Sequence, residues 1–334
     1  NGTGNAYTLD VSDGAAVDAA NLLALNGKTT VPVDLQLITA AGTALNGNYA
    51  ELKALFAAAA SGDYTGLAGN LPITIDDNVN VSQANEISAL TSAAVTANIS
   101  DTVLANYAGL EGTGNAYTIA IADAAIDADA LQALNAKTTV NIDLTGDTSI
   151  SGTLANVNAV VAETGVTNVL NTIAVTITDT ITAAQAETLV GTNVGNVTAT
   201  IAAGTAAGIS GALTGAADGN DNFSITVTDS SVDPALLNTL DSRTATDIDV
   251  SAVNTISGAN AAIVTLYGNT ANFVGLGNEN ITATGGTISV AQANALAGFT
   301  SGTITAQITA GTAAALTALN GTGNAYTLDV SDGA

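Results

Sequence analysis

Asn1-Gly2-Thr3-Gly4-Asn5-Ala6-Tyr7-Thr8-Leu9-Asp10-Val11-Ser12-Asp13-Gly14-Ala15 opens the sequence, and the last fifteen residues, Asn320 to Ala334, repeat it letter for letter. The offset between the two copies is 320 − 1 = 319 residues. An Ala- and Thr-rich composition alone does not produce fifteen consecutive identities, so the sequence has returned to the start of a long repeat. Because it contains no Met, we expect it to be a processed or excised part of a longer chain that repeats this period.

The same stretch recurs inside the period, at Gly112 to Ile119 and, more loosely, at Asn222 to Asp229. Four aromatic residues are then equivalent, namely Tyr7, Tyr117, Phe223 and Tyr326. The period is therefore expected to consist of three members, each a solenoid repeat. The predicted boundaries are 1–110, 111–216 and 217–319, and residues 320–334 begin the next period.

Each member alternates strand patterns with helix patterns. Residues Tyr7 to Asp13 alternate apolar with polar, which is typical of a half-buried strand and predicts that Tyr7, Leu9 and Val11 face inward. Residues 18–25 then have helical spacing, and Asn26-Gly27 are expected to end the helix. This order recurs four times in each member, which predicts twelve strand–helix units of about 27 residues, a length typical of solenoid repeats.

Strands that are joined through helices are expected to be parallel. The sequence therefore predicts an α/β repeat protein. Its fold would be a βα solenoid with a continuous parallel sheet on one side, helices on the other, and about 12 coils per 319-residue period. At a strand spacing of roughly 4.8 Å, twelve coils would extend on the order of 60 Å. Terminal coils of a solenoid normally need polar caps, and neither terminal pattern has one, which also predicts a continuing array.

The composition excludes several classes of function. There are 29 acidic and 4 basic residues and a net charge of −25, whereas nucleic-acid binding needs clustered Lys and Arg. No apolar run reaches the roughly 18 residues that a membrane span requires. The sequence has no His and no Cys, which removes the usual Ser/His and Cys/His nucleophiles and the usual zinc ligands. We therefore expect no enzyme activity, no nucleic-acid partner, no membrane span and, calcium aside, no cofactor.

Three of the four basic residues occupy one repeated position, and each is followed six residues later by Asp. The pairs are Lys28 with Asp34, Lys137 with Asp143, and Arg243 with Asp249. A cation at a helix end also suits the helix dipole. We interpret the three pairs as structural ion pairs between a helix end and the next strand, with a ligand site as the alternative.

Two further recurrent patterns predict helix starts. Capping boxes are expected at Asn80 with Gln83, Thr182 with Gln185, and Ser289 with Gln292. N-caps are expected at Asp18, Asp127 and Asp233, the last of which precedes a proline. Because both patterns explain their spacing without a ligand, we interpret them as structural.

The loop Asp218-Gly219-Asn220-Asp221 is the candidate metal site. Calcium binds several oxygen ligands, and the loop resembles part of a calcium-binding nonapeptide loop, although it lacks the double glycine. The equivalent stretches that begin at Gly2 and Gly112 contain no Asp. Asp218, Asn220 and Asp221 are therefore a candidate calcium site, and a solvated turn is the alternative. Exposed strand threonines such as Thr176 and Thr178 could match ice or carbohydrate, but threonine also simply suits a wet strand face.

The phrases from Thr176 to Ala186 and from Val197 to Ile201 resemble the low-complexity tandem arrays of giant bacterial surface proteins, cyanobacterial ones in particular. The likeness covers the whole chain and lies in its Ala-, Thr- and Asn-rich repeat style. It implies an extracellular surface fibre, sheath component or adhesin. Its partner would be itself, end to end or as a longer covalent repeat chain, with neighbouring fibres or surface polysaccharide as further partners. The alternative is an acidic solenoid module that binds calcium or polysaccharide.

Overall fold

The computed structural model of the chain is an α/β protein whose described strand pairs are all parallel. The structure describes residues 5–14, 16–144, 148–162, 165–167, 173–192, 195–215 and 217–332. The chain divides into two compact units, Asn1–Leu170 and Asn171–Ala334, and each unit is described by itself. The expected α/β class with parallel strands is confirmed.

The first unit is built from short helices and short strands in alternation. Its helices are α1 (Ala19–Asn26), α2 (Gln36–Ala41), α3 (Tyr49–Ala60), α4 (Val81–Ser88), the 3₁₀ helix η1 (Leu104–Gly109), α5 (Ala128–Asn135) and α6 (Leu154–Ala162). Its strands are β1 (Val17–Asp18), β2 (Val33–Asp34), β3 (Leu45–Gly47), β4 (Tyr64–Thr65), β5 (Ile73–Val79), β6 (Val95–Ile99), β7 (Ala116–Thr118), β8 (Ala125–Asp127), β9 (Ile142–Asp143), β10 (Ser149–Gly152) and β11 (Val166–Thr167).

In this part of the chain, the two strands of each pair are separated along the sequence by about one strand–helix repeat. One sheet has the order β1-β3-β5-β6-β7, and β2 pairs with β4, β8 with β10 and β9 with β11. The helices form a continuous series of contacts in chain order. In this series α1 contacts α3, α3 contacts α4, α4 contacts η1, η1 contacts α5, and α5 contacts α6.

The second unit has the same construction. Its helices are α7 (Ala183–Val190), α8 (Ala206–Ala212), α9 (Pro234–Asp241), α10 (Asn260–Gly268), the 3₁₀ helix η2 (Thr270–Asn272), α11 (Val290–Ala297) and α12 (Ala313–Leu316). Its strands are β12 (Ala174–Ile181), β13 (Val197–Ile201), β14 (Asn222–Ser224), β15 (Ser231–Val232), β16 (Ile248–Asp249), β17 (Thr255–Ala259), β18 (Phe273–Val274), β19 (Asn280–Thr284), β20 (Ile304–Gln307) and β21 (Ala325–Thr327).

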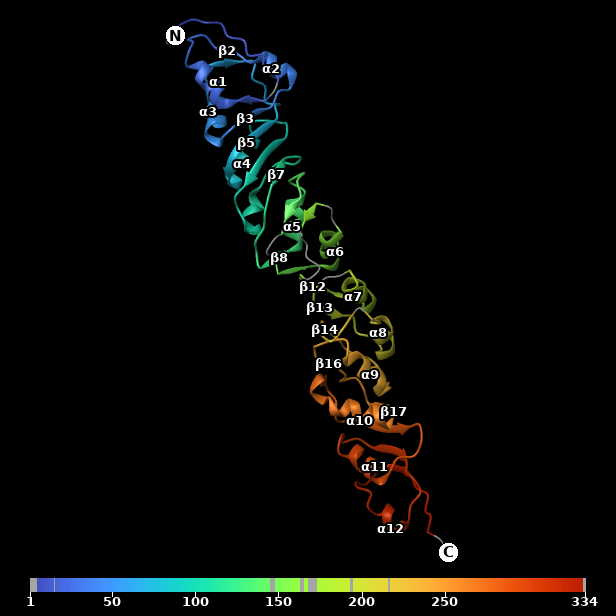
Figure 1. Ribbon diagram of the computed structural model, residues 1–334. Coiled ribbons are helices and arrows are strands. Elements are labelled where there is room, and N and C mark those ends of the chain that lie inside the picture. The colour runs from blue at the N-terminus through green and yellow to red at the C-terminus, as the bar shows by residue number, and fades with distance from the viewer. Residues whose placement is uncertain are drawn as a thin grey trace. The chain divides into compact units, whose positions relative to one another are not determined.

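Here β13 pairs with β12 and β14, one sheet has the order β15-β17-β19-β20-β21, and β16 pairs with β18. The contacts between helices run from α7 to α8, from α8 to α9 and from α9 to α10. Within this unit α7, α8 and α9 lie on one side and β12, β13 and β14 on the other (Figure 1).

The two-residue alternation of the sequence explains which side chains form the core. In β6, Val95, Ala97 and Ile99 are buried, whereas Thr96 and Asn98 are exposed. Such a strand places alternate side chains on opposite faces of the sheet. The apolar face packs against the helix layer, so the core runs between the strands and the helices of each unit.

The predicted helix starts are confirmed. Capping boxes form at Asn80, Thr182 and Ser289, each with the expected glutamine. The side chains of Asp18, Asp127 and Asp233 accept hydrogen bonds from the first turns of α1, α5 and α9. Asn48 with Glu51 forms a further capping box at the start of α3, which the sequence analysis did not identify.

Candidate functional site: contacts of the recurrent aromatic strand

The backbone of the recurrent aromatic residue is hydrogen-bonded to the hydroxyl of a threonine that lies about twenty residues further along the chain. Tyr117 N donates to Thr138 Oγ1 at 3.0 Å, and that hydroxyl donates to Tyr117 O at 2.8 Å. Phe223 N and O make the same two bonds with Thr244 Oγ1, both at 2.9 Å. These threonines directly follow the recurrent Lys or Arg in the sequence. We call them the threonine clamps.

On the opposite side of the strand, the residue two positions before the aromatic one binds the preceding coil. Its side-chain Oδ1 accepts a hydrogen bond from the first residue of the neighbouring strand. The three contacts are Val95 N to Asn115 at 2.8 Å, Val197 N to Asp221 at 2.8 Å, and Ile304 N to Asn324 at 2.9 Å. The amide or carboxylate oxygen therefore extends the ladder of backbone hydrogen bonds where the strand begins.

The two outer copies of the strand each make half of these contacts. Residues 5–13 bind the segment that follows them, because Tyr7 N donates to Thr29 Oγ1 at 3.1 Å and that hydroxyl donates to Tyr7 O at 2.7 Å. Residues 324–332 bind the segment that precedes them, through Asn324 and through the pairing of β21 with β20. The internal copies at residues 115–123 and 221–229 make both sets.

The exposure of apolar side chains also differs between the internal and the outer copies of the strand. Tyr117 and Phe223 are 0% exposed, whereas Tyr7 is 48% exposed, Leu328 47% and Val330 59%. The prediction that Tyr7 faces inward is therefore wrong for this copy, because no described segment covers its second side. Apolar side chains are left uncovered on both outer copies.

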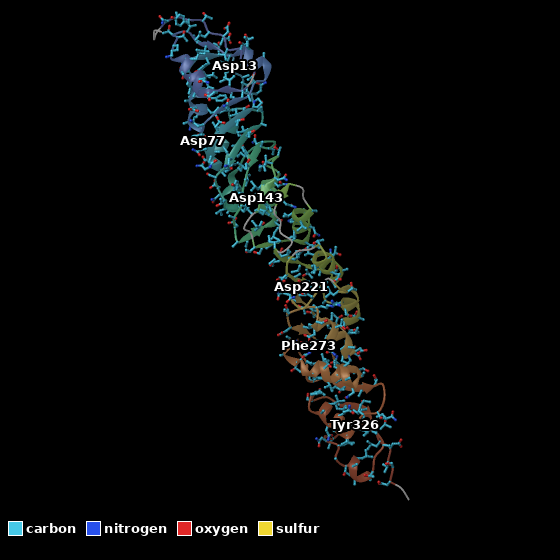
Figure 2. All side chains as sticks on the ribbon, in the orientation of Figure 1. Asp13, Asp77, Asp143, Asp221, Phe273 and Tyr326 are labelled. Carbon is cyan, nitrogen blue, oxygen red and sulfur yellow. The ribbon has the colours of Figure 1, made fainter. Side chains whose placement is uncertain are left out.

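The candidate calcium loop is organised by hydrogen bonds within the protein. Asp218 Oδ1 accepts from Asn220 N at 2.9 Å, and Asp218 Oδ2 accepts from Asn220 Nδ2 at 3.2 Å. Asp221 (Figure 2) is 3% exposed, and its second carboxylate oxygen accepts from Asp218 N at 3.2 Å. Burial raises the pKa of the Asp221 carboxyl, which the hydrogen bonds from Val197 N and Asp218 N partly offset.

The loop at Asp218 also differs in sequence from its equivalents. Gly112 and Gly321 have left-handed φ angles of 75° and 83°, whereas Asp218 stands at that position in its own member. Glycine adopts this left-handed conformation without strain, and at the equivalent position Asp218 N donates to Asp221 Oδ2 at 3.2 Å. Among the residues that the structure describes, no group of three or more His, Cys, Asp or Glu side chains is arranged to hold a metal ion.

Among the described residues, the predicted ion pairs of Lys28 with Asp34 and of Arg243 with Asp249 are not formed, whereas the pair of Lys137 with Asp143 stays a prediction. Arg243 donates to the backbone carbonyls of Thr214 and Ala217, both at 2.9 Å, and Asp249 Oδ1 accepts from Ser251 N at 2.9 Å. Hydrogen bonds from the Ser251 side chain and from its backbone N–H lower the pKa of the Asp249 carboxyl. Likewise, an oxygen of Asp34 accepts from the backbone N–H two positions on, at 2.8 Å. Asp34 and Asp249 therefore stabilise local turns, in which an Asp side chain accepts a hydrogen bond from the backbone N–H two residues later.

An ion pair joins Lys53 Nζ of α3 to Glu86 Oε2 of α4 at 2.6 Å. Tyr49 Oη donates to the same carboxylate at 2.5 Å. Both partners are about half exposed, so the pair contributes little to stability. An open, mainly apolar recess of about 440 Å³ lies beside it between α3 and α4, lined in part by Phe56 and Leu90.

A further set of contacts on the helix side is absent from the sequence analysis. The fifth residue of α4, α7 and α11 binds the backbone that follows the next helix. Asn85 accepts from Glu111 N at 2.9 Å, and Asn294 accepts from Asn320 N at 2.6 Å. Glu187 accepts from Gly215 N at 2.7 Å. The sequence could have indicated these contacts, because an Asn or Glu stands at the same position of three equivalent helices.

No protein-family model, no curated protein and no solved structure matches this chain. None of the described helices is long and apolar enough to cross a membrane. The chain is thus an α/β protein in which the same backbone and side-chain contacts join successive segments in both units.

Proposed function

We propose that the chain is a structural segment of an extracellular, repetitive surface fibre or filament with a mechanical, sheath or adhesive role. Its coils form a βα solenoid of twelve coils per 319-residue period and stack end to end, within one long repeating chain or between copies. It has no catalytic activity, and its main partner is another length of the same repeat.

The order of the helices supports the twelve-coil arrangement. Equivalent helices begin the three members at α1, α5 and α9, and the remaining helices follow in the same sequence in each member, with α2 and η2 as additions. Each coil contributes one strand to the ladder and one helix to the layer of helices. Solenoids are built in this way, since a single unit cannot bury its own apolar face.

The half-sets of contacts on the outer copies are the observation that carries the proposal. Residues 5–13 and 324–332 have the same sequence and use opposite sides of the same strand. The internal copies use both sides at once and are buried. A strand of this sequence is therefore complete only between two coils, which is the property that a continuing array requires.

The net charge and the repeat style support an exposed, exported fibre. A charge of −25 keeps a protein soluble and opposes unspecific association. The extracellular location rests on the resemblance to giant bacterial surface proteins, as do adhesion and contact with neighbouring fibres or surface polysaccharide.

Negative-stain electron microscopy of the native material, followed by denaturing electrophoresis of the same sample, tests the proposal. Long fibres that enter the gel only at very high mass indicate one giant repetitive chain. Fibres that dissociate to a band near 32.4 kDa indicate a non-covalent polymer. Compact particles without fibres contradict the proposal. In that case, calorimetric titration with calcium and with polysaccharide tests the alternative binding module.

A further inference from the structure

We infer that the apolar recess between α3 and α4 binds a small neutral phenol, that is, a benzene ring that carries a hydroxyl group. The ring would lie against Phe56, and the hydroxyl group would lie at the ion pair of Lys53 with Glu86. The site lies within the first unit, and the inference is independent of the proposed fibre role.

The recess has the size and the lining of a small-molecule site. Its volume is about 440 Å³ and its lining is mainly apolar. Ligand pockets span roughly 300–1,000 Å³ and combine apolar side chains with a few polar groups. Phe56 of α3 and Leu90, which follows α4, are half-buried in its walls, and Ile87 is 0% exposed. A ring that covers these side chains removes apolar surface from water, which is favourable.

The equivalent place in the third member already holds an additional aromatic ring. When α10 is aligned with α3 from the N-cap, Tyr267 stands at the position of Phe56. When α11 is aligned with α4 in the same way, Phe299 stands at the position of Leu90. The rings of Tyr267 and Phe299 are stacked, with centroids 5.1 Å apart and planes at 6°. Because Leu90 replaces the second ring in the first member, an aromatic ligand would take the place of that ring beside Phe56.

A polar rim distinguishes the recess from its equivalent. Lys53 Nζ donates to Glu86 Oε2 at 2.6 Å and to Tyr49 Oη at 3.1 Å. The ammonium also lies 5.4 Å from the centre of the Tyr49 ring. In the third member the three equivalent positions are occupied by Asn260, Val264 and Ala295. The rim is therefore not a general property of the repeat.

The rim offers one donor and one acceptor to a ligand. An ammonium has three N–H bonds, of which Lys53 uses two among the described residues. Glu86 accepts its hydrogen bonds from Lys53 and Tyr49 through Oε2. A hydroxyl group both accepts and donates a hydrogen bond. It would accept from Lys53 and donate to Glu86 Oε1.

Both charged groups of the rim are held in their charged forms. The hydrogen bonds of Lys53 to Glu86 and to Tyr49 raise the pKa of its ammonium. Those that Glu86 accepts from Lys53 and Tyr49 lower the pKa of its carboxyl. The donor and the acceptor that a hydroxyl group needs are thus both present at neutral pH.

The charge of the chain favours a neutral ligand over an anionic one. A net charge of −25 repels anions, and the cation at the rim is already paired with Glu86. A phenol is neutral at pH 7, since a phenolic hydroxyl has a pKa of about 10. An aromatic carboxylate with the same ring is therefore expected to bind more weakly than the phenol.

Fluorine NMR of 4-fluorophenol in the presence of the full chain tests the site. A saturable shift or broadening of the ligand signal is expected, with a dissociation constant on the order of 1 mM for so small a ligand. Leu90→Phe is the test variant, because it places a ring where Phe299 stands in the third member. The variant should fill the recess and abolish the saturable change.

Ala54→Phe is the matched control for this variant. It adds the same type of side chain at an exposed position of α3 that does not line the recess. It should leave the binding of 4-fluorophenol unchanged. Circular dichroism of both variants establishes that each folds as the unmodified chain does.

Lys53→Met tests the role of the rim, because it keeps an apolar stem and removes the ammonium. It should weaken the binding of 4-fluorophenol about 3-fold to 10-fold, since a hydrogen bond to a charged group at an exposed site contributes modestly. Fluorobenzene, which has no hydroxyl group, should bind equally well to the variant and to the unmodified chain.

Two results would overturn the site itself: no saturable binding of 4-fluorophenol to the unmodified chain, or undiminished binding to Leu90→Phe. An equal effect of Lys53→Met on 4-fluorophenol and on fluorobenzene would overturn the assignment of a phenol, because the hydroxyl group would then not be recognised. Tighter binding of 4-fluorobenzoate than of 4-fluorophenol would overturn it as well.

Discussion

The threonine clamp at Thr244 allows one prediction to be worked out from the structure. Thr244→Val keeps the volume of the side chain and removes its hydroxyl. Phe223 N and O then lose their partners at 2.9 Å, and Phe223 is 0% exposed, so water does not replace them. An unsatisfied buried polar group costs about 1–3 kcal/mol. Partial relaxation of the two groups leaves an expected loss of about 2–4 kcal/mol.

A comparison with the equivalent clamp at Thr29 distinguishes the effect of burial from the effect of the hydrogen bonds themselves. Its hydroxyl makes the same two bonds, at 3.1 and 2.7 Å, but Tyr7 is 48% exposed. Water can satisfy the groups that lose their partner there, so Thr29→Val is expected to cost no more than about 1 kcal/mol. Thr226→Val, at an exposed position that forms an isolated bridge with Asp249, is the control and should lie within about 0.5 kcal/mol of the unmodified chain.

Hydrogen exchange measured by mass spectrometry is the assay, because long repeat arrays need not unfold in one step. For Thr244→Val, the opening constant of the peptide that contains β14 should rise about 30-fold to 1000-fold, since 1.4 kcal/mol corresponds to a factor of ten. A change equal to that of Thr29→Val would refute the reasoning, because it would mean that burial of the strand does not decide the contribution of the clamp.

Three further predictions concern single positions. Tyr64→Phe should cost about 1 kcal/mol, because it removes the hydrogen bond from the Tyr64 hydroxyl to the backbone carbonyl of Leu22 at 2.8 Å; thermal unfolding measures the loss. Gly275→Ala should cost at least about 1 kcal/mol more than Gly285→Ala. Both glycines have left-handed φ angles, of 89° and 84°, but only at Gly275 would a Cβ meet other atoms, the nearest at 2.6 Å. The raised pKa of Asp221 means that the folded chain holds this proton to higher pH than the unfolded chain, so its contribution to the free energy of unfolding decreases as pH rises above the ordinary pKa of 3.8. Asp221→Asn should remove that decrease in urea titrations between about pH 3 and pH 7, and an unchanged pH profile would contradict the assignment.

Much of the fold follows from local patterns in the sequence. The alternation of Val95, Ala97 and Ile99 with polar residues predicts their burial correctly, because a strand places alternate side chains on opposite faces. Capping boxes such as Asn80 with Gln83 are equally local and are confirmed. Each of these features depends on residues within one turn or one strand.

The features that the sequence left open depend on contacts between segments. Asp34 and Asp249 recur beside a cation, yet both bind a backbone N–H two positions away, because a local turn holds the carboxylate. Asp218 and Asp221 have the composition of a calcium loop, but Asp221 is bound to Val197 N of a neighbouring strand. Spacing along the chain does not reveal that partner. The clamps were missed because Thr is also an ordinary strand residue.

Exchange protection of residues 324–332 measures most directly whether this strand is completed by a neighbouring coil. In dilute solution, the amide of Tyr326 should exchange rapidly, because no described clamp accepts its hydrogen bond. Once the chain assembles, peptides that contain Tyr326 should become as protected as those that contain Phe223, whose amide binds Thr244 at 2.9 Å. Assemblies in which Tyr326 still exchanges rapidly, or dilute monomers in which it is already protected, would contradict the stacking of coils through this strand.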